Sequence, residues 1–326
     1  MSTINNGTLQ GVDSGKNGSP SDNLALFLKV FSGEVLTAFA RRSVTMDKII
    51  TRTIASGKSA AFPVIGRAAA FYLAPGESVL DKQTAIKNTE KVITIDGLLA
   101  ASTIVFDIQN AMAYFDSRQE YANQLGESLA ITVDQNVLAE IAILTNTGTD
   151  ENLPGLGHTK VYAIDDATDP ATFGKAILSQ LMVARGAFTD NYVLTGDRYA
   201  YVEPETYSAI LAALMPNSAQ YSALGDLEKG VLSNVGGWTI VEVPHLSGSV
   251  DPKHTFPTTG DVTKENVVVL LAHKSAVGMV KLKDVKLERE RKAEYQGDLI
   301  VSTLACGVGG LRPEAAAAIV LKASGE

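Results

Sequence analysis

The chain has 326 residues, of which 45% are hydrophobic and 20% are charged. That length predicts two domains or one large discontinuous domain, and the composition excludes a disordered or collagen-like chain. The formal net charge is −8, whereas a protein that coats nucleic acid normally carries a basic excess. A single cysteine, Cys306, excludes an intramolecular disulfide framework, and we expect it to be a small core residue.

No segment predicts a membrane span or a secretory signal. The longest apolar stretch, residues 24–40, is interrupted by Lys29 and Glu34. It also begins late in the chain and lacks a basic flank. We therefore expect a soluble protein that is made in a cytoplasm and has no membrane partner.

The N-terminal region predicts a flexible tail followed by a helix. Residues 1–23 are mostly small and polar, and such a segment cannot bury enough surface to offset its ordering entropy. Between Leu24 and Phe39, apolar residues recur at helical spacing and also occupy the opposite side. A helix that is apolar nearly all round is buried on both sides. The second apolar side of this helix packs against either a neighbouring subunit or the core of the same chain, and the pattern alone favours neither.

Residues 50–98 predict a projecting two-stranded ribbon. A turn is predicted at residues 74–77. Short extended patterns precede it at 49–54, 62–65 and 70–73, and another follows it at 90–96. From Arg41 to Lys91 there are nine basic and four acidic residues, which gives a local charge of +5 in an acidic protein. An isolated ribbon is marginal in water, and a long connection inside a compact domain is uncommon. We therefore expect this ribbon to lie on an acidic neighbour.

A long helix is predicted after the ribbon. Residues 104–146 have a helical pattern, in which apolar residues from Tyr121 to Ile141 recur every four positions. Because a step of four drifts about 40° per repeat against the 3.6-residue turn, the apolar stripe winds around the helix. We expect a sheet to pack on one part of the stripe and another element on a different part.

Residues 150–272 predict a mixed α/β domain. Asp169-Pro170 forms an N-cap and N1 pair that opens a helix, and a short helix is expected at 207–214. Strands are expected at 199–202, 238–243 and 266–272. The last of these has an unbroken apolar run, which is typical of a strand buried on both faces.

Two long strands are predicted after Val277. Residues 285–292 are strand-like but heavily charged on both faces, whereas 299–311 are mostly apolar. We expect these strands to form a hairpin that packs on the 117–146 helix. The charged run is either a solvated face or an intersubunit charge ladder, and the sequence favours neither.

No catalytic or cofactor motif is complete. Gly57-Lys58-Ser59 lacks the earlier glycine of a phosphate-binding loop, because Arg52 stands at that position. Gly155-Leu156-Gly157 lacks the third glycine of a dinucleotide fingerprint. Four histidines have no metal-ligand spacing and are expected in loops or on the surface, namely His158, His245, His254 and His273. We therefore expect no enzyme, no cofactor and no metal site.

Several long blocks resemble the major capsid proteins of short-tailed, T7-like bacteriophages. Two of them are Tyr72-Leu73-Ala74-Pro75-Gly76-Glu77 and Gly309-Gly310-Leu311-Arg312-Pro313. The others lie at residues 24–39, 56–64, 89–98, 124–129, 208–217 and 242–246. The blocks keep the family's order over about residues 24–320. The resemblance departs in residues 1–23 and in the loops around 146–172 and 247–264.

The resemblance implies an HK97-type capsid fold of the α+β class. Its parts would be an N-terminal arm, an extended E-loop hairpin, a peripheral (P) domain with a long spine helix, and a mixed α/β axial (A) domain. These parts would cover residues 1–50 for the arm, 51–98 for the E-loop, 99–149 and 273–310 for the P domain, and 150–272 and 311–326 for the A domain. The family builds virions, so the resemblance also implies an icosahedral shell of hexamers and pentamers that encloses double-stranded DNA. Such shells assemble in the host cytoplasm with a scaffolding protein and a portal at one vertex, and DNA contacts would be non-specific.

Self-association is the function that these features predict. The basic E-loop would pair with an exposed sheet edge of an adjacent subunit, and the arm helix would cross a further subunit boundary. The side chains expected at subunit contacts are Phe27, Phe31, Phe39, Arg52, Lys58, Arg67, Phe71, Tyr72, Lys82, Lys87, Arg289 and Arg291.

Two alternatives remain. An encapsulin-like compartment shares the fold and would hold cargo peptide instead of DNA. A soluble α/β enzyme would be a monomer or small oligomer with a polar pocket, and the incomplete motifs disfavour it.

Overall fold

The computed structural model describes residues 34–39, 42–65, 70–82, 88–106, 118–147, 160–165, 169–214, 225–226, 231–232, 234–248 and 251–322. The chain divides into two compact units. The first comprises Met1–Ser43, Gly97–Val133 and Lys281–Cys306. The second comprises Val44–Asp96, Asp134–Val280 and Gly307–Glu326. The predicted tail at 1–23 lies outside the described residues.

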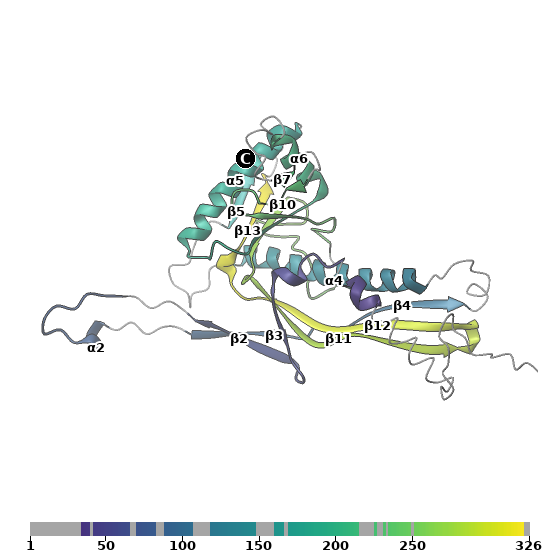
Figure 1. Cartoon of the computed structure of the whole chain (residues 1–326). Helices are drawn as coiled ribbons and strands as arrows, with labels where there is room; N and C mark the ends of the chain where they lie inside the picture. Colours follow the sequence, from purple (N-terminus) through teal and green to yellow (C-terminus); the bar gives the residue numbers. More distant parts are fainter. Residues whose placement is uncertain are drawn as a thin grey trace, which may run out of the picture. The chain divides into compact units, whose positions relative to one another are not determined.

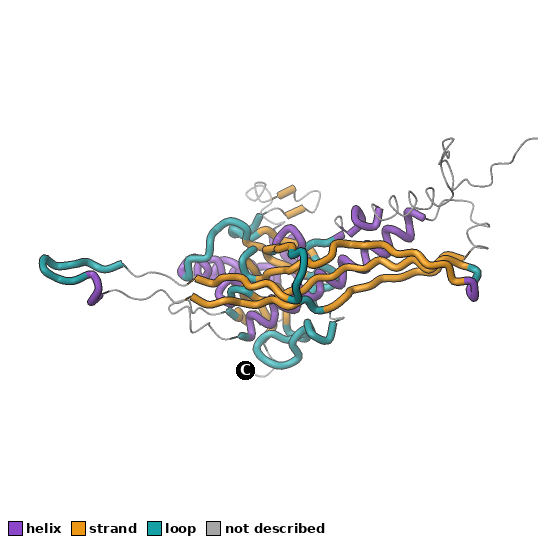
Figure 2. Tube along the Cα trace, turned by 90° about the horizontal axis from the view of Figure 1, so that it is seen from below, coloured by secondary structure: helices purple, strands orange, loops and turns teal. Residues whose placement is uncertain are grey.

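Three long strands and one short strand form a four-stranded sheet. Its order is β1 (Ile50–Thr53), β11 (Val277–Lys292), β12 (Gly297–Gly310) and β4 (Gly97–Phe106). The predicted hairpin is therefore present as β11 and β12, whose turn is a short 3₁₀ helix at Ala293–Tyr295. Figure 2 shows these long strands side by side. β12 pairs antiparallel with β4 from Gly297 opposite Phe106 to Cys306 opposite Gly97.

The long helix α4 (Arg118–Asn146) is confirmed, but its predicted start was wrong. Residues 104–106 belong to β4, because their apolar run completes the ladder with β12. In the first unit, Ala122 and Leu125 of α4 pack on Ile300 of β12, so the expected sheet does cover part of the apolar stripe. α4 has the length and apolar content of a membrane span, yet most of it is buried inside the protein, as expected for a core helix.

The second unit contains a five-stranded mixed sheet (Figure 1). Its order is β5 (Val161–Ile164), β13 (Ala316–Leu321), β10 (Val267–His273), β6 (Arg198–Val202) and β9 (Thr239–Glu242). The β10 strand pairs antiparallel with both of its neighbours, whereas the two outer pairs are parallel. The predicted buried strand is thus the centre of the sheet.

Two helices pack together beside this sheet, α5 (Pro170–Asp190) and α6 (Pro204–Leu214) (Figure 1). The predicted cap is confirmed, because the Asp169 side chain accepts a hydrogen bond from Thr172 N at 3.0 Å. Gly174 lets the helices approach closely, since a Cβ there would meet the backbone of Ala209. A small hairpin of β7 (Gly225–Asp226) and β8 (Val231–Leu232) follows α6.

The predicted ribbon is present as the antiparallel pair β2 (Ser59–Ile65) and β3 (Asn88–Thr94). Its register runs from Ser59 opposite Thr94 to Ile65 opposite Asn88. Beyond this pair, the described part of the loop is residues 70–82, which include the short helix α2 (Val79–Lys82). Both strands lie within residues 51–98, for which we keep the name E-loop, and we call the pair β2 and β3 its ribbon.

Candidate assembly surfaces

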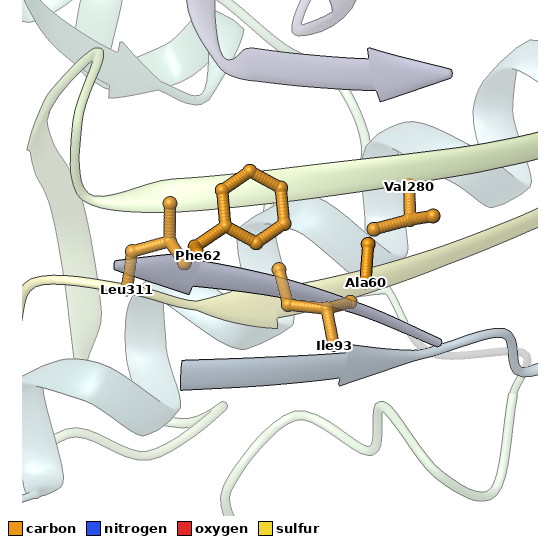
Figure 3. Close-up of a cluster of buried hydrophobic side chains, with 5 residues drawn as sticks. All are labelled: Ala60, Phe62, Ile93, Val280 and Leu311. Carbon is orange, nitrogen blue, oxygen red and sulfur yellow. The ribbon is translucent and has the colours of Figure 1, made fainter. Parts of the chain in front are cut away.

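An apolar cluster holds the root of the E-loop to the body of the second unit. Alternate ribbon positions Ala60, Phe62 and Ile93 pack against Val280 of β11 and Leu311, which follows β12 (Figure 3). Side chains two apart on a strand share a face, so one face of the ribbon is buried here and the other is open. The root is therefore part of the folded subunit.

A polar cluster lies at the same root. His254 is 5% exposed and lies between two carboxylates. Its Nε2 is 2.8 Å from Asp96 Oδ2, and its Nδ1 is 2.8 Å from Glu140 Oε1. Burial disfavours the charged ring, but the hydrogen bonds and negative charges of Asp96 and Glu140 outweigh burial and raise the pKa of His254 to about 9.

One of the four histidine predictions was wrong. His273 lies at the end of β10 and is buried, whereas a loop or surface position was expected. His254 lies in a loop, as predicted, although it is buried there. A buried histidine needs polar partners for its ring. For His254 one partner is Glu140, which is distant in the chain, and for His273 it is Ser275, two residues further on. Cys306 is buried, as expected. Within the part of the chain that the structure describes, no group of three His, Cys, Asp or Glu side chains is placed to hold a metal ion.

The tip of the E-loop exposes apolar side chains. Tyr72 is 98% exposed and Leu80 is 79% exposed, and Phe71, Leu73 and Val79 are exposed as well. Apolar side chains gathered on an exposed loop are typical of a surface that binds another protein.

The tip is ordered around one carboxylate. Glu77 accepts hydrogen bonds from Ala74 N at 3.0 Å and from Lys82 Nζ. The backbone N–H of Ala74, together with Lys82, holds the pKa of the Glu77 carboxyl below its ordinary value. The predicted turn is confirmed by a hydrogen bond from Glu77 N to Ala74 O at 3.1 Å and by Gly76, whose φ of +94° favours glycine.

The arm helix contacts α4 at a glycine. Residues 34–39 are helical, and Val35 and Phe39 are buried. A Cβ on Gly126 would lie 2.6 Å from Val35 O and 2.8 Å from Phe39 N. Only glycine therefore lets the arm backbone approach α4 this closely.

We predict that Gly126→Ala displaces the arm helix. The added methyl meets backbone atoms that cannot move aside individually, so the expected destabilisation is about 1–3 kcal/mol. Hydrogen exchange of residues 34–39 should accelerate, as measured by mass spectrometry. Gly186→Ala in α5 is the matched control, because nothing lies within 4 Å of the added methyl. That control should stabilise slightly, and an equal effect of both changes would contradict the assignment.

The arm root is held by a buried carboxylate. Asp134 of α4 is completely buried and accepts hydrogen bonds from Val44 N at 2.8 Å, Thr45 N at 3.3 Å and Thr45 Oγ1 at 2.5 Å. Hydrogen bonds to an ionised acceptor are stronger than neutral ones. The chain that leaves toward the arm is therefore fixed where it reaches α4.

The charged strand β11 pairs much of its charge within the subunit. Arg289 donates to Asp298, and Arg291 Nη1 lies 3.8 Å from Asp298 Oδ1. Lys286 and Lys292 pair with the neighbouring glutamates Glu288 and Glu290 at 2.8 Å. Lys286, Glu288 and Glu290 are largely solvated and Lys292 is partly so, and exposed pairs of this kind contribute about 0–1 kcal/mol. An intersubunit ladder stays a prediction.

The predicted contact residues fall into three groups. Outside the described residues lie Phe27, Phe31, Arg67 and Lys87. Phe39 is 2% exposed, so its side chain is already covered within its own chain. The remaining seven are described on or near the surface, namely Arg52, Lys58, Phe71, Tyr72, Lys82, Arg289 and Arg291. Their role in subunit contacts stays a prediction.

Arg52 has a role within the subunit. Its Nη1 donates to Ala61 O at 2.8 Å, and its guanidinium lies 6.0 Å from the centre of the Phe62 ring. Arg52, which lies in β1, therefore holds β2 at the root of the ribbon.

Sequence reasoning missed Asp96, Asp134, Glu140 and His254. For Asp134 a signal was available, since it is an acid beside the apolar stripe of a long helix. The other three come from separate parts of the chain, and no local spacing connects them.

A family model described as "Gp10A-like: Major capsid protein" matches residues 61–320. The chain belongs to the Gp10A-like major capsid protein family. The major capsid protein of Enterobacteria phage T3 is 54% identical, over 98% of this chain and 99% of that protein. The major capsid protein of Escherichia phage T7 is 52% identical, over 99% of each chain.

A solved capsid structure of the Cyanophage P-SCSP1u is similar to this Gp10A-like chain with a TM-score of 0.69 and 30% identity, over 86% of this chain and 89% of that one. The resemblance to T7-like phages and the HK97-type α+β capsid fold are therefore confirmed. The chain is a structural protein of the virion capsid, and these matches do not favour an encapsulin-like compartment.

Proposed function

We propose that copies of this chain assemble into the hexamers and pentamers of an icosahedral phage head, in which each E-loop lies across the adjacent subunit. The observation that carries the proposal is the exposed tip, where Tyr72 and Leu80 are left almost uncovered by their own chain. Covering apolar surface is favourable by about 25 cal/mol per Å². A second copy that covers the tip would recover this free energy at every contact of the shell.

The root of the E-loop supports this role. An apolar cluster and Arg52 hold the root of the E-loop in the folded subunit. The tip is therefore attached to a folded base and is not at the end of an unstructured chain. Less conformational entropy is then lost when the tip docks. The docking contact is heterologous, since the tip of one copy meets a different surface of the next, and such contacts close into rings.

The expected four-part division belongs to this proposal. Residues 1–50 act as the arm, 51–98 as the E-loop, 99–149 and 273–310 as the P domain, and 150–272 and 311–326 as the A domain. The boundaries between the two compact units fall inside α4, β11 and β12. The two units therefore do not correspond to the four parts of this division.

The further partners are also proposed. A scaffolding protein guides assembly, a portal occupies one vertex, and packaged double-stranded DNA is contacted without sequence specificity. A net charge of −8 suits an inner wall to which DNA does not adhere. The chain acts as a building block without catalysis.

Electron microscopy of the full-length chain, expressed with and without the phage scaffolding protein, tests the proposal. Closed shells of uniform size are expected with the scaffold, and irregular or fewer particles without it. A chain that remains a monomer or small oligomer under both conditions would overturn the proposal. Particles that enclose a protein cargo in place of DNA during infection would support the compartment instead.

A further inference from the structure

We propose that His254 is the positioning residue that fixes the E-loop ribbon to the body of the subunit by bridging the carboxylates of Asp96 and Glu140. The proposal concerns the subunit itself, and its consequence for shells rests on the proposed function. Asp96 stands between the end of β3 at Thr94 and the start of β4 at Gly97. It is therefore the point at which the returning ribbon strand joins the body.

The geometry favours a charged ring. Both ring nitrogens of His254 lie 2.8 Å from carboxylate oxygens, one of Asp96 and one of Glu140. A carboxylate accepts hydrogen bonds, so the imidazolium, which carries a proton on both nitrogens, is the form of the ring that pairs with both oxygens. A neutral ring donates from one nitrogen and would leave one of these two contacts unmade.

Each carboxylate also holds the end of β12. Val308 N donates to Asp96 Oδ2 at 3.2 Å, and Gly310 N donates to Glu140 Oε2 at 3.1 Å. His254 thus joins two carboxylates that both carry backbone contacts of the same strand. The cluster links the ribbon, α4 and β12, which are three elements that must keep their places if the E-loop is to leave the body in one direction.

The charges around His254 balance only when the ring is protonated. Lys253 Nζ lies 4.0 Å from Asp96 Oδ1 and donates to Asp96 O at 2.5 Å. Together Lys253 and the imidazolium offset Asp96 and Glu140. When the ring loses its proton, Lys253 is the one positive charge left at this site among the described groups, and it is half exposed. Two largely buried carboxylates are then incompletely compensated, which is unfavourable.

The sign of the pH dependence follows. The pKa of His254 is raised from its ordinary value of 6.5 to about 9, by hydrogen bonding and charge that outweigh burial. The stabilisation is complete below pH 6.5 and is lost as the pH rises through about 9. The ribbon root should therefore loosen at alkaline pH and remain fixed near neutrality.

Hydrogen exchange of the full-length chain, corrected for the intrinsic rate at each pH, measures the ribbon root directly. His254→Gln should exchange about tenfold faster in β2 and β3 at pH 7, as expected when a charge-assisted hydrogen bond is lost. In the wild type, protection should fall progressively between pH 6.5 and about 9. In Glu140→Gln this fall should end at a lower pH, because one of the two groups that raise the pKa becomes neutral.

The matched control is His245→Gln. Its Nε2 lies 3.9 Å from Asp134 Oδ2, which is beyond hydrogen-bond distance, and it is remote from the ribbon in sequence. Exchange of β2 and β3 should be unchanged in this variant.

A pH-dependent fall in protection that Glu140→Gln does not shift would overturn the proposal, and so would unchanged exchange in His254→Gln. Electron microscopy of the same wild-type preparation distinguishes failure of the His254 proposal from failure of the proposed function. Wild-type shells together with unchanged His254→Gln exchange refute the positioning residue alone, whereas absent wild-type shells refute the proposed function.

Discussion

Replacing residues 66–87 with an Asn-Gly turn should abolish shell formation and leave the subunit folded. The last paired residues of the ribbon are Ile65 and Asn88, so a two-residue turn can close the hairpin after them. The apolar cluster at the root keeps all of its side chains. The variant loses only the surface that is proposed to dock on the next copy.

Electron microscopy and sedimentation measure this result. Few or no shells are expected with the scaffolding protein present, while circular dichroism and the melting temperature stay close to those of the wild type. A second variant, Tyr72→Ser with Leu80→Ser, keeps the loop length and removes apolar contact. We expect it to reduce shells strongly. Normal shells from the Asn-Gly variant would refute the E-loop assignment.

Asp134→Ala should release the arm root and lower the free energy of unfolding of the second unit by about 3 kcal/mol. The reason is that Val44 N and the Thr45 N–H and hydroxyl lose their shared acceptor in a buried site. Urea denaturation gives the stability, and limited proteolysis should show faster cleavage near residue 44. Asp134→Asn keeps one acceptor oxygen, so its loss should be smaller.

Asp165→Ala is the matched control for Asp134. Asp165 lies 2.9 Å from Lys322 Nζ, but its side chain is largely in solvent. Exposed ion pairs contribute about 0–1 kcal/mol, so this change should be near neutral. Similar losses in Asp134→Ala and Asp165→Ala would contradict the anchoring role of Asp134.

Elements with strong local signals could be predicted from the sequence. The Asp169-Pro170 pair placed the start of α5, and the unbroken apolar run identified β10 as a buried strand. The ribbon followed from extended patterns around the turn at 74–77. In each case the residues that decide the structure are close together in the chain.

Elements decided by distant partners could not be predicted in the same way. Residues 104–106 are apolar without a clear period, and their pairing with β12 makes them a strand. His254 is buried because Asp96 and Glu140, which are far away in sequence, satisfy its ring. A single sequence carries no signal for such contacts between residues that are distant in the chain. The resemblance to a capsid family provided the fold, but it did not identify these polar contacts.

The most direct test of the central claim is a cryo-electron microscopy reconstruction of the assembled shell, at a resolution that defines side chains. The claim is that one copy leaves its E-loop tip uncovered and that another copy covers it. The expected result is that Tyr72 and Leu80 are buried against a neighbouring subunit in every capsomer. Closed shells in which both side chains remain in solvent, or fold back on their own chain, would contradict it.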